Sequence, residues 1–186
     1  IDVQREPQHI LDQYGPDATK VGKYAYNCLL ARRLAERGVR FIQLYHRGWD
    51  AHNNAPKQVP AQCHDTDRPT AALLLDLKQR GMLDDTLVIW TGEFGRTPRV
   101  NKKAGRDHWG KCNTIWMAGA GVPGGQLYGK SDKTASEPVE DAVSPSEIAA
   151  TIYHLLGLDS ARLIRDQLQR PFPLAEAKPL LKYLGS

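Results

Sequence analysis

Cysteine is scarce in this chain of 186 residues, and the three cysteines present form no recognisable pattern. Because their number is odd and no C-x-x-C spacing is present, neither a zinc ribbon nor a complete disulfide framework is indicated. Cys28 falls within a helical pattern and is typical of a small core residue. Cys63 and Cys112 flank the polar segments discussed below, so the sequence is compatible with a disulfide between them but does not require one.

Long apolar runs, internal repeats and several catalytic motifs are also missing. No run approaches the length of about 20 residues that a transmembrane helix needs, so no membrane span is expected, and no signal peptide is visible. A Gly-x-Ser-x-Gly nucleophile motif is absent, and the glycine-rich stretch 119–125 lacks the Lys-Ser/Thr pair of a phosphate-binding loop. The chain begins with Ile rather than Met, so we expect a processed or excised piece of a longer protein.

Positive charge is concentrated in one part of the chain, although the net charge of +4 is modest. Between positions 96 and 111, Asp107 is the only acidic residue among six basic ones: Arg96, Arg99, Lys102, Lys103, Arg106 and Lys111. One interpretation is a solvated basic loop, and the other is a segment that binds an anionic substrate or partner. A nucleic-acid-binding domain is disfavoured, because no known module is present and the charges do not alternate with stacking aromatics.

The distribution of apolar residues predicts one domain of the α/β class. Residues 1–18 are polar, contain proline and glycine, and are expected to form a lead-in segment. Beyond it, helical patterns alternate with apolar strand patterns: helices at 19–37, 67–80 and 148–156, and strands at 39–45, 87–90, 114–118 and 126–128. This alternation favours a largely parallel sheet with flanking helices, formed by residues 19–186.

Polar side chains lie at the ends of the expected strands. Asp50 and His52 follow the first strand, Glu93 and Arg96 follow the second, and His108 precedes the third. Open α/β sheets bind ligands at the carboxyl ends of their strands. Carboxylate and imidazole groups that converge there suit a divalent metal such as zinc or manganese, and arginines beside the metal would hold phosphate or sulfate oxygens.

Each of these residues also has a simpler interpretation. Asp50 can close a turn through its own backbone, and His52 can be an exposed loop residue. Glu93 can brace its loop by pairing with Arg96 or Arg99, and His108 can be a structural histidine. The joint metal-site hypothesis is favoured because the polar residues follow one another at successive strand ends.

Four strings in the chain resemble a known family. They are Gly48–His52, Leu83–Pro98, Gly105–Trp109 and Ala118–Gly121. Together they closely resemble the DUF1501 family, bacterial proteins related to the alkaline phosphatase/sulfatase superfamily, over residues 29–159. The resemblance implies an alkaline phosphatase-like sandwich, incomplete at its N-terminal side, with a metal centre at the strand ends. It also implies hydrolysis of phosphate or sulfate esters, or phosphoryl transfer.

The resemblance assigns a role to each candidate residue. Asp50, His52 and His108 would bind one metal ion, and Glu93 would support or bind a metal; the expected metal is zinc, manganese or calcium. The anion-binding residues would be Arg96 and Arg106, and the catalytic nucleophile is expected outside this chain. Two departures stand out: Phe94 occupies the place of a histidine, and the Asp50-x-His52 spacing is tighter than the usual Asp-x-x-x-His.

The expected function is therefore that of a sulfatase/phosphatase-like, metal-dependent hydrolase domain that acts on a small anionic ester and is inactive as this fragment. The alternative is a non-catalytic exported binding protein that retains the fold, and Phe94 favours it. Family members often carry twin-arginine export signals, which implies a periplasmic or exported parent protein.

Overall fold

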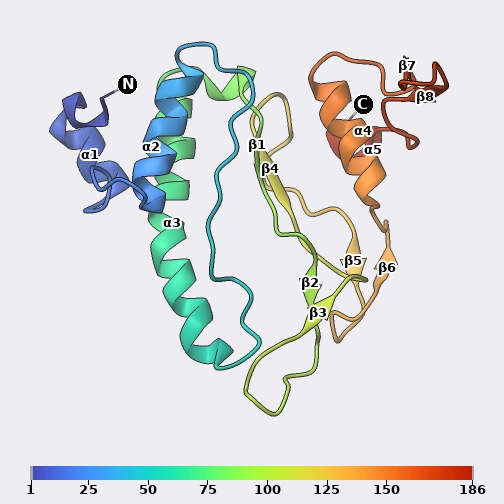
Figure 1. The fold of residues 1–186 in the computed structure, drawn as a ribbon, viewed down its shortest axis with the longest axis horizontal. Coiled ribbons are helices and arrows are strands. Elements are labelled where there is room, and N and C mark those ends of the chain that lie inside the picture. The colour runs from blue at the N-terminus through green and yellow to red at the C-terminus, as the bar shows by residue number, and fades with distance from the viewer. Residues whose placement is uncertain (1, 186) are drawn as a thin grey trace. The chain divides into compact units, whose positions relative to one another are not determined.

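A computed structural model describes residues 2–185 (Figure 1). The chain divides into two compact units. Unit 1 comprises the residues up to Thr86 together with Arg96–Trp109, and unit 2 comprises Leu87–Gly95 together with the residues from Gly110 onward.

Unit 1 is built from helices. Its elements are a 3-10 turn η1 (Val3–Arg5), helices α1 (Gln8–Tyr14), α2 (Tyr24–Ala35) and α3 (Ala55–Gln79), and a 3-10 turn η2 (Leu83–Asp85). Helix α2 packs along α3, and α1 contacts both. The buried face of α3 repeats at helical spacing through Thr66, Pro69, Leu73 and Leu77. Cys28 is fully buried in this core, and all three cysteines are free thiols.

A buried cluster of charges ties the N-terminal residues to this core. The guanidinium of Arg32, whose side chain is 1% exposed, donates to Asp76 over 2.8 Å and to Glu6 over 2.5 Å. The hydroxyl of Tyr14 donates to the same Asp76 carboxylate over 3.1 Å. Charges buried in this way are tolerated only when they are paired. Residues 3–14, expected to form a lead-in segment, are therefore two ordered elements that contribute Val3, Ile10 and Tyr14 to the core.

Helix α3 begins at Ala55, earlier than the start near position 67 predicted from the sequence. Pro60 and Pro69 both lie inside the helix. Each proline removes one backbone hydrogen bond from the helix interior. The helix continues through both positions, and Pro69 itself lies on the face that is buried against the rest of unit 1.

The predicted strand at 39–45 is wrong. These residues follow α2 without joining any sheet. Among the residues that the structure describes, no backbone–backbone hydrogen bond involves positions 40–48. The side chains of Phe41 and Tyr45 are mostly exposed, at 78% and 77%.

Unit 2 contains short antiparallel strand pairs and helices α4 (Pro145–Leu155) and α5 (Leu181–Leu184). Strand β1 (Val88–Trp90) pairs with β4 (Trp116–Ala118), where Trp90 stacks on Trp116 at 6.4 Å between ring centroids. The other pairs are β5 (Lys130–Ser131) with β6 (Pro138–Glu140), and β7 (Leu163–Arg165) with β8 (Pro171–Pro173). The predicted strand at 126–128 does not form; the nearest strand is β5.

The fold class predicted from the sequence, an alkaline phosphatase-like sandwich with a largely parallel sheet, is therefore wrong for the described residues. The apolar runs that form β1 and β4 pair antiparallel with each other, and the run at 39–45 pairs with neither. Alternating helix and strand patterns do not fix strand direction, and without parallel neighbours no βαβ crossover exists. The sheets within residues 2–185 have two strands each.

Helix α4 matches its prediction closely. Ser144 caps its first turn, and Glu147 returns the hydrogen bond to the Ser144 backbone, which completes a capping box. Gly157 follows the helix with a φ of 74°, a conformation that favours glycine. No helix in the described part of the chain is long and apolar enough to cross a membrane, in agreement with the expected lack of a membrane span.

Candidate metal centre

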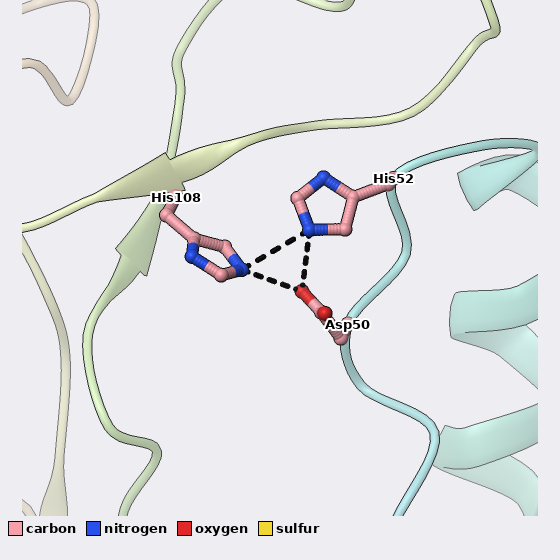
Figure 2. A group of neighbouring side chains, drawn as sticks. All are labelled: Asp50, His52 and His108. Atoms are coloured by element: carbon pink, nitrogen blue, oxygen red, sulfur yellow. Dashed lines mark hydrogen bonds and ion pairs between the residues drawn. The ribbon is translucent and has the colours of Figure 1, made fainter.

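Asp50, His52 and His108 meet at one point in unit 1 (Figure 2). Asp50 and His52 lie in the loop before α3, and His108 opens strand β3 (His108–Trp109), which pairs with β2 (Gly95–Arg96). The two histidine Nε2 atoms are 3.1 Å apart. Oδ1 of Asp50 lies 3.0 Å from Nε2 of His52 and 2.9 Å from Nε2 of His108. Three potential ligand atoms therefore form a nearly equilateral triangle, which we call the triad.

Backbone hydrogen bonds hold the two segments of the triad together. The amides of Asn54 and Ala55 donate to the carbonyls of Lys103 and Ala104 over 2.9 and 2.8 Å. The amide of Arg106 donates to the Ala51 carbonyl over 3.0 Å. The loop containing Asp50 and His52 is thus fastened along its length to the segment that leads into His108.

Gly105 makes this close approach possible. A Cβ atom at position 105 would lie 2.0 Å from the carbonyl carbon of His52 and 2.4 Å from the backbone nitrogen of Asn53. These are backbone atoms, which cannot move away from the added Cβ as the end of a flexible side chain could. Any side chain at position 105 would therefore force the two segments apart.

Asn101 and Asp107 form a second layer of contacts around His52. Oδ1 of Asp107 lies 3.0 Å from Nδ1 of His52 and accepts a hydrogen bond from Nδ2 of Asn101 over 3.2 Å. The same Asn101 amide donates to the His52 carbonyl over 3.0 Å. The hydrogen bonds from His52 and Asn101 lower the pKa of Asp107, so its carboxyl group is ionised at neutral pH.

The charges around Asp50 keep it ionised as well. The hydrogen bond from His108 is the largest influence on the Asp50 carboxyl group, and the nearby charges of His52 and Arg96 act in the same direction. Together they lower the pKa of Asp50. Nη2 of Arg96 lies 3.2 Å from Oδ1 of Asp50. The triad therefore places an anionic oxygen beside two imidazole rings.

This donor set fits a divalent transition metal. Ligand atoms that share a metal at bonds of about 2.1 Å lie about 3.0–3.4 Å from one another, and the triangle has edges of 2.9–3.1 Å. Two imidazoles and one carboxylate suit zinc or manganese. Calcium takes oxygen ligands almost exclusively, so the two histidines disfavour it.

Of the remaining residues predicted for the site, two lie in unit 1 and one lies in unit 2. Arg96 reaches the triad directly. Arg106 contributes its backbone amide to the contact with Ala51, while its side chain is exposed. Glu93 belongs to unit 2, in an exposed bend after β1. Metal binding by Glu93 and anion binding by Arg96 and Arg106 stay predictions.

A hollow of about 530 Å³ in unit 1 reaches the outer edge of His52. It is lined by His52, Asn53, Asn101, Lys102, Lys103 and Asp107. Its two lysines belong to the basic segment at positions 96–111. The hollow thus combines positive charge with access to a triad histidine.

Sequence reasoning missed the contributions of Asn101, Gly105 and Asp107. Asp107 stood out only as the single acid of a basic segment, directly before His108. Its partner His52 is 55 positions earlier in the chain, so the contact becomes visible only in the fold. Gly105 likewise gave no signal of its own, because its role depends on a segment that is distant in sequence.

Residues 1–184 match the family model described as "Protein of unknown function (DUF1501)". No curated protein and no solved structure matches the chain.

Proposed function

Because the chain belongs to the DUF1501 family, we propose that its triad is the metal centre of a sulfatase/phosphatase-like hydrolase acting on small anionic esters. The convergence of Asp50, His52 and His108 carries this proposal. Two sequence segments with recognisable strings bring two imidazole nitrogens and a carboxylate oxygen to one point. The relation to the alkaline phosphatase/sulfatase superfamily is part of the same proposal.

The metal, when bound, supplies a Lewis acid that withdraws charge from the sulfuryl or phosphoryl oxygens of the ester. The protein's own residues define its surroundings. His52 and His108 contribute neutral nitrogen ligands and Asp50 a single negative charge, so a divalent ion keeps a positive charge that attracts an anion. Arg96, within 3.2 Å of Asp50, adds a guanidinium whose geometry suits sulfate or phosphate oxygens.

The hollow beside His52 supports an anionic substrate. Lys102 and Lys103 line it, and Asp107 is the only acidic residue among its lining residues. Positive charge of this kind raises the local concentration of anions and orients them on approach. In this proposal Arg106 assists as an anion-binding residue. Export of the parent protein to the periplasm or cell surface belongs to the same proposal.

Metal binding is the first test. We expect the purified chain to bind about one zinc or manganese ion, measured by elemental analysis and by titration calorimetry after chelator treatment. Replacing one of three ligands, as in His108→Ala, should weaken binding at least tenfold, because the remaining two ligands cannot close the shell.

The matched control is His154→Ala, because His154 is exposed on α4 in unit 2. This variant should bind metal as the wild type does. A wild-type protein that takes up no metal, even after metal is added back, contradicts the proposed centre. Equal loss in the His154 variant would show non-specific binding by surface histidines.

A second candidate function is a non-catalytic exported binding protein, and Phe94 in place of a histidine favours it. Hydrolysis of aryl sulfates and aryl phosphates by the metal-loaded, full-length parent protein separates the two, because this fragment alone is expected to be inactive. Metal-dependent turnover that is lost in Asp50→Ala supports the hydrolase. Tight metal and anion binding without turnover on either ester class supports the binding protein.

A further inference from the structure

His52 is contacted through both of its ring nitrogens. Nε2 belongs to the triad, while Nδ1 lies 3.0 Å from the Asp107 carboxylate on the opposite side of the ring. A neutral imidazole has one N–H group and one lone pair, and the contact at one nitrogen decides which group the other presents. Asp107 therefore acts on the nitrogen that faces the triad.

The proton positions follow from the chemistry of the partners. An ionised carboxylate can only accept, so the contact with Asp107 requires a proton on Nδ1 of His52. Nε2 of His52 then carries a lone pair. Nε2 of His52 lies 3.1 Å from Nε2 of His108, so only one of these two nitrogens carries a proton in this contact, and a proton on His108 can be accepted by Asp50 over 2.9 Å. The geometry is satisfied when His108 supplies the N–H group and His52 the lone pair.

Asp107 is itself held in place from several sides. Asn101 donates to the same carboxylate oxygen and also to the carbonyl of His52. The backbone amide of Asp107 donates to Oγ1 of Thr97 over 3.1 Å, and its carbonyl accepts from the Thr97 amide over 2.8 Å. The backbone and the ring of His52 are therefore fixed by one small frame of three residues.

We propose that Asp107 is the positioning residue of the metal centre: it keeps the proton of His52 on Nδ1 and aims the Nε2 lone pair at the metal, while Asn101 fixes Asp107. The role in metal binding rests on the proposed function, whereas the proton position of His52 does not. A carboxylate behind a histidine ligand makes the ligand more basic and orients its ring, and loss of such a partner typically costs about 10–100-fold in metal affinity.

The test separates the proton position from metal binding. The metal-free protein, labelled with 15N at histidine, is examined by NMR at a pH about two units above the usual histidine pKa of about 6.5. We expect the nitrogen shifts of His52 to report a proton on Nδ1. In Asp107→Ala this proton should move to Nε2, where the Asp50 carboxylate can accept it. In Asp107→Asn the side-chain oxygen can still accept, so the proton should remain on Nδ1.

Metal affinity is measured on the same variants. Asp107→Ala should bind zinc about 10–100-fold more weakly than the wild type, and Asp107→Asn should recover part of that loss. Asp84→Ala is the control, because Asp84 is an exposed aspartate of unit 1 in η2. It should change neither the His52 shifts nor the affinity. Circular dichroism confirms that each variant is folded before it is compared.

The outcomes distinguish the two proposals. A wild-type His52 with its proton on Nε2, or an unchanged proton position in Asp107→Ala, overturns the role of Asp107. A proton shift accompanied by unchanged metal affinity overturns the positioning role in metal binding. A wild-type protein that binds no metal but shows the expected proton shift overturns the proposed function, while the contact of Asp107 with His52 stands.

Discussion

Gly105 is the residue at which a single added methyl group would most disturb the triad. In Gly105→Ala the new Cβ would meet the backbone of His52 and Asn53 at 2.0–2.4 Å, so the two segments must separate. We expect zinc affinity to fall at least tenfold and the free energy of unfolding to fall by about 1–3 kcal/mol, as for other overpacked sites. Calorimetric titration and urea unfolding measure the two effects.

The control for this substitution is Gly110→Ala. Nothing lies within 4 Å of a Cβ built at Gly110, and its φ is not in the left-handed region. The Gly110 variant should bind metal normally. Wild-type affinity in Gly105→Ala would show that the close approach of the two segments is not needed to form the triad.

At the scale of single residues, the sequence grouped Asp50, His52 and His108, and these side chains do meet. The expected cause, a shared edge of a parallel sheet, is wrong. Asp50 and His52 were expected to meet His108 because they left parallel strands at one edge of a sheet. They meet because Asn101 and Gly105 fasten their loop to the segment before β3. Such contacts between distant segments leave no periodic signal, whereas the ligand residues themselves are recognisable by chemical type. Their role as metal ligands stays a prediction.

Among the elements, the extended segment at 40–48 is the most unusual. Its backbone groups make no backbone–backbone hydrogen bonds with the described residues, although its apolar composition is typical of a strand. We expect its amides to exchange with deuterium much faster than those of α2 around Cys28 and Leu29, which are fully buried. Hydrogen exchange followed by mass spectrometry tests this expectation. Protection of 40–48 equal to that of α2 would mean that these amides have acceptors.

Elements whose signals lie within one turn of the chain were predicted well. Pairings between strands that are distant in sequence were predicted poorly. The capping box at Ser144 and the glycine at 157 define α4 because each acts within a single turn. Strand direction depends on which distant segment becomes a neighbour, so the sequence could not show that β1 pairs antiparallel with β4. The predicted start of α3 near position 67 is wrong because Pro69, a residue type that also suits the first turn of a helix, lies inside α3.

For the molecule as a whole, the buried charges around Arg32 make stability depend on pH. Burial alone would raise the pKa of Glu6, but the hydrogen bonds and charges of Arg32 and Arg33 outweigh it and lower that pKa. A lowered pKa means that Glu6 stabilises the fold fully above its unfolded pKa of about 4.3 and loses this contribution as the pH falls further. Acid should therefore weaken the attachment of residues 3–14.

Urea unfolding of Glu6→Gln measures this contribution. At pH 7 the variant should be less stable than the wild type by about 1.5–3 kcal/mol, the usual contribution of a hydrogen bond to a charged group. The difference should shrink as the pH is lowered below about 4.3. Glu176→Gln, at an exposed position, should match the wild type throughout. A difference that stays constant with pH would show that the ionised form of Glu6 is not what matters.

Because the two units alternate along the chain, the residues of the triad are synthesised at different times. The chain enters unit 2 after Thr86, returns to unit 1 at Arg96, and leaves again after Trp109, so neither unit is one continuous stretch. Asp50 and His52 leave the ribosome first, and His108 follows His52 by 56 residues. At a synthesis rate of about 5–20 residues per second, His108 is added roughly 3–11 seconds after His52. During that interval the nascent chain carries only two of the three candidate ligands, and β1 has already emerged before the triad can close.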